Sequence, residues 1–255
     1  MIGFEQFGTG EHKLIGMHGW FGNEDTFKSL QLSLDPRKYQ CAWLAHRGYG
    51  RSVAVAGNYS MAEMADDALA VADNLGWTSF SVIGHSMGAK AAQVLATRVP
   101  SRVKKLIAVT PVSADPIPLD PQTRSLFEAA TRSPESRRSV IDFSTGGRLS
   151  SVWIDQLACD SIARSTSEAS AAYLRSWADD DFSGSIRRCE IQTLVVVGVE
   201  DPSITPQLCE LGFRSRYPHL AIVAMQNSGH YPMDEIPLAF GATVAAFLQS
   251  SAGQR

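Results

Sequence analysis

The segment from Gly84 to Gly88 places Ser86 midway between two glycines, with one residue on each side of it. An apolar run at residues 80–83 comes directly before this segment, and a helix-period stretch at residues 87–99 follows it. A strand that turns sharply into a helix through a serine holds that residue in a strained conformation and needs small neighbours. A glycine-rich turn that merely contains a serine is the alternative. The strand before and the helix after favour a nucleophilic serine at the carboxyl end of a sheet.

A serine hydroxyl is a weak nucleophile until a base takes its proton, and an acid must hold that base in the right tautomer. Asp201 comes just after one apolar run, and His230 follows the next run in a Gly-His-Tyr-Pro segment. Glu200 is the alternative acid, but Asp201 lies at the better distance from the end of its strand. We therefore predict a triad of Ser86 as nucleophile, His230 as base and Asp201 as acid.

A second loop offers the hydrogen-bond donors that acyl transfer requires. An apolar run at residues 13–17 leads directly into His18-Gly19-Trp20-Phe21. Two backbone donors must point to the place where negative charge develops. We predict the N–H groups of Trp20 and Met87 in this role. His18 could act as a base, but a buried histidine that bonds loop carbonyls is favoured. The rings of Trp20 and Phe21 either line a pocket or pack the loop.

These residues need a scaffold that brings separate turns to one edge. Short apolar runs rich in Val, Ile and Leu alternate with helix-period segments at residues 60–75, 87–99 and 237–248. Runs of this kind are typical of strands buried on both faces of a parallel sheet, and the alternation predicts a doubly wound, mostly parallel α/β sheet. The expected strands are residues 13–17, 39–44, 80–83, 103–109, 193–199 and 220–225.

Residues 112–188 interrupt this alternation because they contain no convincing strand. Four short helical segments replace the strands, at residues 121–131, 134–143, 151–164 and 168–177. We predict an all-helical cap inserted into a core domain made of residues 1–111 and 189–255. The acidic triplet at residues 179–181 is expected to be a solvated turn, with selection of a cationic substrate as the less favoured alternative.

Several aromatic or imidazole side chains could contact a substrate under such a cap. The candidate pocket residues are Phe21, His85, Trp153 and Trp177. The cap aromatics, which include Tyr173, would otherwise form the core of the cap, and at helical spacing that interpretation is favoured.

The composition excludes several classes of protein. The chain has 255 residues and a formal net charge of −3, and its basic residues form no stripe with aromatics, so we expect no nucleic acid partner. The four cysteines are far apart, which favours reduced thiols over disulfides. We find no phosphate loop, dinucleotide fingerprint or metal-ligand spacing, and therefore expect no cofactor and no metal. Without a signal peptide or a membrane span, we expect a soluble, cytoplasmic protein. The oligomeric state stays open.

Taken together, the motifs resemble the α/β-hydrolase family over nearly the whole chain. Within the family, the chain is most similar to small capped esterases, epoxide-hydrolase relatives and cofactor-free haloperoxidase-like enzymes. Epoxide hydrolases and dehalogenases carry an aspartate at the elbow, which Ser86 argues against. Two positions depart from the family pattern: Ala45 replaces a common aspartate, and Ala89, followed by Lys90, replaces a common glycine. The resemblance rests on His18-Gly19, the segment from Arg47 to Ser52, the segment from Gly84 to Gly88, Gly198-x-x-Asp201 and Gly229-His230.

This resemblance implies hydrolysis of a small, fairly apolar ester, thioester or lactone through an acyl-enzyme intermediate. Other activities on the same fold remain open. The same triad can cleave a carbon–carbon bond in ring-fission products, the fold supports cofactor-free oxygenase or lyase chemistry, and a slow-turnover ligand receptor is a third alternative. Fold alone does not choose among them.

Overall fold

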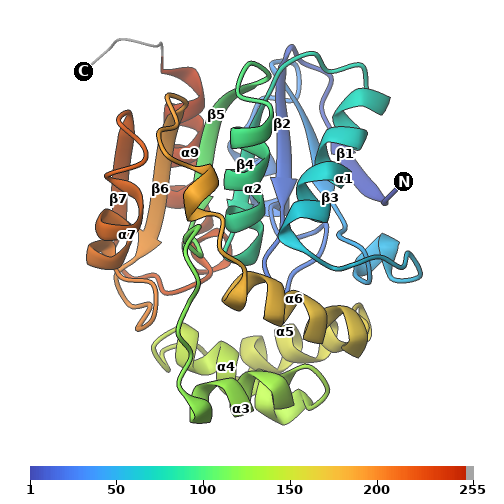
Figure 1. The fold of residues 1–255 in the computed structure, drawn as a ribbon, viewed down its shortest axis with the longest axis vertical. Helices are drawn as coiled ribbons and strands as arrows, with labels where there is room; N and C mark the ends of the chain where they lie inside the picture. The colour runs from blue at the N-terminus through green and yellow to red at the C-terminus, as the bar shows by residue number, and fades with distance from the viewer. Residues whose placement is uncertain (251–255) are drawn as a thin grey trace.

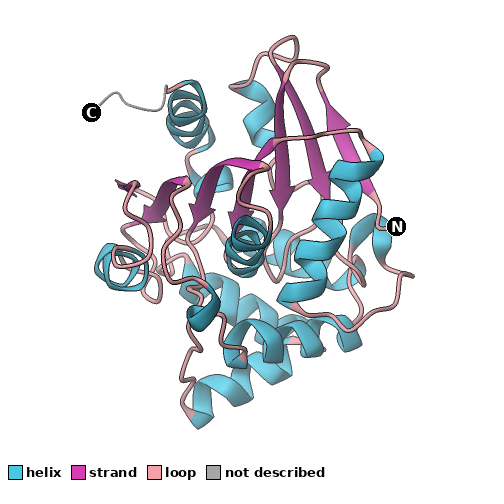
Figure 2. Ribbon diagram, turned by 45° about the horizontal axis from the view of Figure 1, so that its top comes forward, coloured by secondary structure: helices cyan, strands magenta, loops and turns pink. Residues whose placement is uncertain are grey.

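Seven strands form one sheet in the computed structural model of this protein, which describes residues 1–250 (Figures 1 and 2). Their order across the sheet is β1-β3-β2-β4-β5-β6-β7. β1 runs antiparallel to β3, and the other neighbouring pairs are parallel. The prediction of a doubly wound, mostly parallel sheet is confirmed. The strands are Phe4–Phe7 (β1), His12–Met17 (β2), Tyr39–Leu44 (β3), Phe80–His85 (β4), Val103–Val109 (β5), Gln192–Gly198 (β6) and Leu220–Met225 (β7).

The burial of each strand explains how well its sequence predicted it. Every residue of β4 is buried, and in β5 only Lys104 is exposed. Such strands read as continuous apolar runs because helices cover both faces of the sheet. β1 is a four-residue edge strand that is only half-buried, so its sequence Phe-Glu-Gln-Phe gave no apolar run to detect.

Helices pack on both faces of the sheet. α1 and α2 cover one face, and α9 lies on the other (Figures 1 and 2). The hydroxyl of Ser60 accepts the N–H of Glu63 and so caps α1. The helices outside the insertion are α1 (Met61–Asn74), α2 (Met87–Arg98), α7 (Pro206–Phe213), α8 (Pro232–Glu235) and α9 (Pro237–Gln249), with short 3₁₀ turns at Lys28–Leu32, Gly50–Ser52 and Ser183–Ser185.

Four helices are inserted between β5 and β6 and lie together beyond the carboxyl ends of the central strands (Figure 1). They match the four predicted segments because strong local signals mark their beginnings. Each begins after a side-chain N-cap, which is Asp120, Ser133, Ser150 or Thr166. The helices are α3 (Pro121–Ala130), α4 (Pro134–Ser144), α5 (Ser151–Ala163) and α6 (Ser167–Asp179).

Lys90 of α2 ties both ends of this helical insertion to the sheet. Its ammonium group is fully buried and donates to the carbonyl oxygens of Asp115, Trp177 and Asp180, at 3.1, 3.0 and 2.7 Å. Asp115 lies on the entering segment, and the other two lie on the leaving one. The unusual lysine after the elbow therefore holds the insertion in place.

The four cysteines are free thiols; Cys159 is exposed, and the others are buried. Among residues 1–250, no helix is both long enough and apolar enough to cross a membrane.

Candidate active site

Ser86 lies at the turn from β4 into α2 and has a strained backbone. Its φ of 52° is in the left-handed region, which residues with a side chain rarely adopt. Its N–H donates to the carbonyl oxygen of Val109 at 2.9 Å, which anchors the turn to β5. A Cβ at Gly84 would lie 2.4 Å from the carbonyl oxygen of Gly88, and one at Gly88 would lie 2.2 Å from that of Met17. Only glycine fits at either position.

Asp201 and His230 form a hydrogen-bonded pair at the ends of β6 and β7. Asp201 Oδ2 lies 2.5 Å from His230 Nδ1. The other carboxylate oxygen of Asp201 accepts the N–H groups of Ser203 and Ile204 at 2.9 and 3.0 Å. The Asp201 side chain is completely buried, whereas the imidazole is 14% exposed. With Nδ1 bonded to the acid, Nε2 is the nitrogen left for chemistry. Glu200 is exposed and does not take part.

The backbone of His230 is held from several sides. Its N–H donates to the carbonyl oxygen of Ser144 at 3.1 Å. Its own carbonyl oxygen accepts from His85 Nε2 and from the hydroxyl of Thr110, both at 2.9 Å. Glu235 accepts the N–H groups of the residues on either side of His230. Hydrogen bonds on several sides therefore anchor the loop that carries His230.

The structure brings His230 beside the elbow without a direct bond to Ser86. Within residues 1–250, the hydroxyl of Ser86 forms no hydrogen bond. His85 provides the link, because its ring centroid lies 5.0 Å from that of His230 and it directly precedes Ser86. Hydrogen bonds between a nucleophile and its base are often long before the substrate binds.

The loop after β2 approaches the elbow closely. A Cβ at Gly19 would lie 2.5 Å from His85 Nδ1 and 3.3 Å from the Cβ of Ser86. Within the described residues, the N–H groups of Trp20 and Met87 donate no hydrogen bond, so both are free to serve a ligand. Met87 is the first residue of α2, where the helix leaves its N–H groups unpaired.

His18 is occupied by the loop itself. Its Nδ1–H donates to the carbonyl oxygen of Gly19 at 2.8 Å, and its Nε2 accepts the backbone N–H of His46 at 3.2 Å. Burial lowers the pKa of His18 to about 4, so the ring is neutral near pH 7. Both ring nitrogens are used, which leaves none for proton transfer with Ser86.

The candidate pocket residues fall into two aromatic groups above the elbow. Trp20 stacks on Phe21 at a centroid distance of 4.4 Å and contacts Trp177 of α6 at 5.7 Å. Trp153 of α5 packs edge-on against Tyr231 at 5.6 Å, next to His230. The indole N–H of Trp20 donates to the carbonyl oxygen of Ser170, so this side chain ties the loop to α6.

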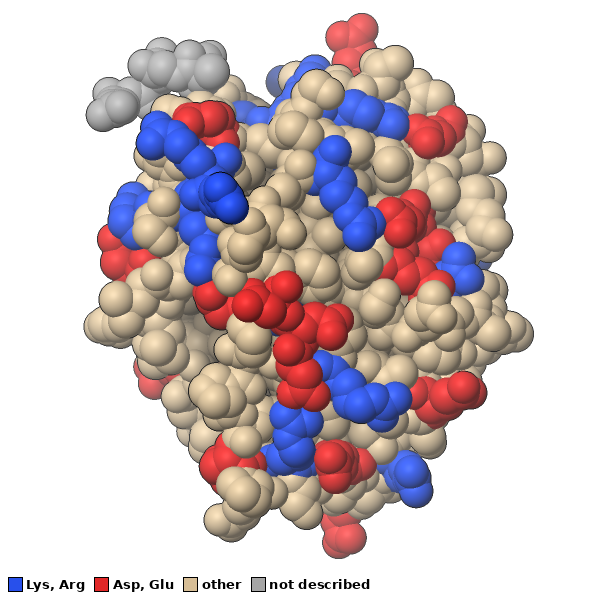
Figure 3. All heavy atoms as spheres, viewed as in Figure 1, with Lys and Arg blue, Asp and Glu red and all other residues tan. Residues whose placement is uncertain are grey.

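Charges of both signs are interspersed on the face shown in Figure 3. The acidic triplet is used within the structure. Asp179 pairs with Arg124, and Asp180 accepts the hydroxyl of Ser176. Asp181 accepts the N–H of Ser183 in the turn that follows. Asp179 is the last residue of α6, so the helix extends into the expected turn, and only Asp180 and Asp181 lie in the connection that follows.

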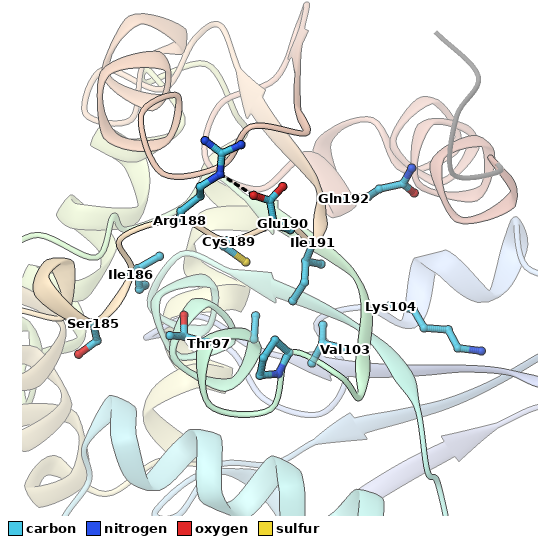
Figure 4. Close-up of a pocket in the computed structure, with 12 residues that line it drawn as sticks. Thr97, Val103, Lys104, Ser185, Ile186, Arg188, Cys189, Glu190, Ile191 and Gln192 are labelled. Atoms are coloured by element: carbon cyan, nitrogen blue, oxygen red, sulfur yellow. Dashed lines mark hydrogen bonds and ion pairs between the residues drawn. The ribbon is translucent and has the colours of Figure 1, made fainter.

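A pocket of about 490 Å³ lies at the amino ends of β5 and β6, away from Ser86 (Figure 4). It is lined by parts of residues 96–104 and 185–192, and two lining residues of the second segment, Arg188 and Glu190, pair with each other at 2.5 Å. No member of the predicted triad lines this pocket. The convergence of side chains, rather than this cavity, therefore marks the candidate active site.

Residues 14–237 match the family model described as the alpha/beta hydrolase fold. The chain belongs to this family. An esterase from Exiguobacterium antarcticum shares this hydrolase fold, with a TM-score of 0.86, 20% identity and coverage of 98% of this chain and 96% of that one.

Two curated relatives differ in how much of this chain they align with. A pimeloyl-[acyl-carrier protein] methyl ester esterase of Yersinia enterocolitica is 27% identical over 96% of both chains. A putative carbamate hydrolase of Caulobacter vibrioides is 34% identical over 46% of this chain and 42% of its own length. The alignments with the first curated relatives thus span less than half of those proteins.

Several groups that hold His230 were not predicted from the sequence. Thr110 directly follows β5, Glu235 ends α8, and Arg148 lies between α4 and α5. A threonine, a glutamate and an arginine in such places are usually turn or surface residues. They are distinguished only by their position around one loop in the folded protein, and no residue spacing in the sequence predicts that position.

Proposed function

We propose that this protein is a serine hydrolase that cleaves a carboxylic ester bond through an acyl-enzyme intermediate. The observation that carries the proposal is the buried Asp201–His230 pair, held beside an elbow that strains Ser86. A structural histidine needs no fully buried acid at 2.5 Å, and a structural serine needs no left-handed backbone.

In the first step, the Oγ of Ser86 attacks the carbonyl carbon while His230 Nε2 takes its proton. The charged imidazole is stabilised by Asp201, which accepts its Nδ1–H and keeps the ring oriented. The tetrahedral intermediate then collapses, and His230 gives the proton to the leaving alcohol. In the second step, water attacks the acyl-enzyme with His230 again as base, and the carboxylic acid and free Ser86 are released.

The N–H groups of Trp20 and Met87 are proposed to bind the oxyanion in both steps. Neither N–H group has a partner among residues 1–250, which supports this role, as does the position of Met87 at the positive end of α2. Fixed backbone donors cost no reorganisation when the charge forms, which is why they stabilise a transition state better than water does.

We further propose that residues 112–188 act as a cap domain on a catalytic domain of residues 1–111 and 189–255, of which 251–255 lie outside the described residues. Aromatic rings of the cap, Trp177 and Trp153, contact Trp20 and Tyr231 respectively, and this apolar lining favours a small and fairly apolar acyl or alkyl group. The methyl ester esterase among the relatives supports an ester, and thioesters and lactones share the same carbonyl chemistry.

The proposal is tested with Ser86→Ala on p-nitrophenyl acetate. We expect the turnover of this variant to fall by about 10⁶-fold, as removal of a triad serine does elsewhere, and its labelling by a fluorophosphonate to disappear. Ser101→Ala changes an exposed serine outside the site and should keep both. Turnover at the wild-type rate in Ser86→Ala would end the proposal, and oxygen uptake that survives in this variant would indicate an oxygenase.

A further inference from the structure

Glu235 is a buried carboxylate that no step of the proposed reaction uses. Its side chain is only 1% exposed, although it lies at the end of the short helix α8. One oxygen accepts the N–H of Gly229 at 2.8 Å, and the other accepts the N–H of Tyr231 at 3.0 Å. These two N–H groups belong to the residues immediately before and after His230.

Arg148 completes this arrangement from the helical insertion. Its guanidinium group donates to the Glu235 oxygen that binds Gly229, at 2.9 Å. Arg148 lies in the connection between α4 and α5, and the same region touches the loop twice more. The carbonyl oxygen of Ser144 accepts the N–H of His230, and Thr145 packs against Gly229 so closely that a Cβ there would lie 2.8 Å from its Cα.

We propose that Glu235 is a positioning residue for His230. Its two contacts with the backbone N–H groups on either side of His230 form a clamp, and Arg148 joins the helical insertion to this clamp. This inference rests on the proposed function. Buried backbone N–H groups require an acceptor, so a carboxylate that binds one on each side of His230 restricts the loop at both ends. The imidazole can keep its 2.5 Å contact with Asp201 only while the loop stays in place.

The chemistry of the clamp requires a carboxylate. Glutamate offers two acceptor oxygens, one for each N–H, and its charge matches Arg148. Glutamine at this position has a single oxygen, and its amide group would face the other N–H as a second donor. Glu235→Gln should therefore open one half of the clamp, and Glu235→Ala both halves.

The test compares kcat and KM of the variants on p-nitrophenyl acetate. We expect kcat to fall by about 10-fold in Glu235→Gln and by about 100-fold in Glu235→Ala, since a displacement of about 1 Å can cost about 100-fold in rate. KM should stay within threefold, because substrate contacts are intact. Arg148→Met leaves both N–H contacts of Glu235 in place, so its loss should be smaller than that of Glu235→Gln.

Glu210→Gln is the matched control, since Glu210 also pairs with an arginine, Arg214, but on an exposed face of α7. A kcat within threefold of wild type in a folded Glu235→Gln or Glu235→Ala protein would overturn the inference, and so would a loss carried by KM alone. If neither variant folds, amide exchange in the wild type decides: slow exchange at Gly229 and Tyr231 supports the clamp, and fast exchange refutes it.

Ser86→Ala, measured in parallel, separates the two proposals. If Ser86→Ala keeps wild-type turnover, the proposed function fails whatever Glu235 does. If Ser86→Ala is inactive and the Glu235 variants match the wild type, only the positioning role fails.

Discussion

Glu200 and Asp201 are neighbouring carboxylates in very different surroundings. Asp201 is fully buried and accepts three hydrogen bonds, from His230 and from two backbone N–H groups. Glu200 is exposed and directs its charge to solvent. The turn after β6 thus selects one of two adjacent acids, and burial gives the selected one a strong and directional interaction with the imidazole.

Asp201→Asn tests which acid serves the base. The amide keeps the size of the side chain but cannot accept the Nδ1–H while its NH₂ faces the ring, so the wrong tautomer is favoured. We expect kcat on p-nitrophenyl acetate to fall by roughly 10⁴-fold. Glu200→Gln, the adjacent control, should stay within twofold. A large loss in Glu200→Gln and none in Asp201→Asn would reverse the assignment.

At this scale, the sequence indicates residues that a motif contains and misses those that act through folding. Ser86, Asp201 and His230 were selected from their order and from the strands before them. Thr110 and Glu235 were not predicted because their partners are backbone groups. Thr110 binds a carbonyl oxygen far away along the chain, and Glu235 binds N–H groups within the loop of His230. Backbone contacts leave no mark on residue spacing.

The elbow between β4 and α2 is the element on which the site depends. Gly88 lies where α2 crosses the end of β2, and the carbonyl oxygens of Met17 and His18 would be 2.2 and 2.5 Å from an added Cβ. Main-chain atoms cannot turn aside as a flexible side chain can. Close packing here brings Ser86 and the loop of Trp20 together.

Gly88→Ala tests this packing. The added methyl group must push α2 away from β2, and we expect the free energy of unfolding to fall by about 3 kcal/mol. Gly184→Ala is the control, since no atom lies within 4 Å of a Cβ there, and it should change the stability by less than about 0.5 kcal/mol. Urea unfolding measures both. Equal stabilities for the two variants would contradict the close approach.

The elements themselves were predictable where local chemistry or burial was strong. All four insertion helices begin at side-chain caps, α3 and α4 also at a proline, and the central strand β4 is buried throughout. β1 and α7 were not predicted. β1 is short and half-exposed. α7 begins with a capping threonine and a proline, Thr205 and Pro206, but it is only eight residues long. How the insertion packs on the sheet depends on long-range contacts such as those of Lys90.

The whole molecule contains three buried histidines near the carboxyl end of its sheet. His18, His46 and His85 are each no more than 2% exposed. Burial lowers the pKa of His18 to about 4 and holds the pKa values of His46 and His85 well below the ordinary range; the neighbouring His18 and His230, respectively, lower these two further. The fold therefore requires neutral imidazoles.

This requirement predicts a loss of stability in acid. Below pH 6.5 the unfolded chain binds a proton at His18, whereas the folded chain does so only near pH 4. The contribution of His18 is therefore fully present above pH 6.5 and is lost as the pH falls toward 4, by on the order of 3 kcal/mol.

His18→Gln removes this titration but keeps an acceptor for the N–H of His46. We expect the free energy of unfolding of the wild type, relative to this variant, to fall between pH 7 and pH 4. His12→Gln at an exposed histidine should leave the pH dependence as it is. If the difference in the free energy of unfolding between wild type and His18→Gln stays constant across this range, the imidazole of His18 is not held neutral. The inference that loop groups occupy both of its ring nitrogens would then be wrong.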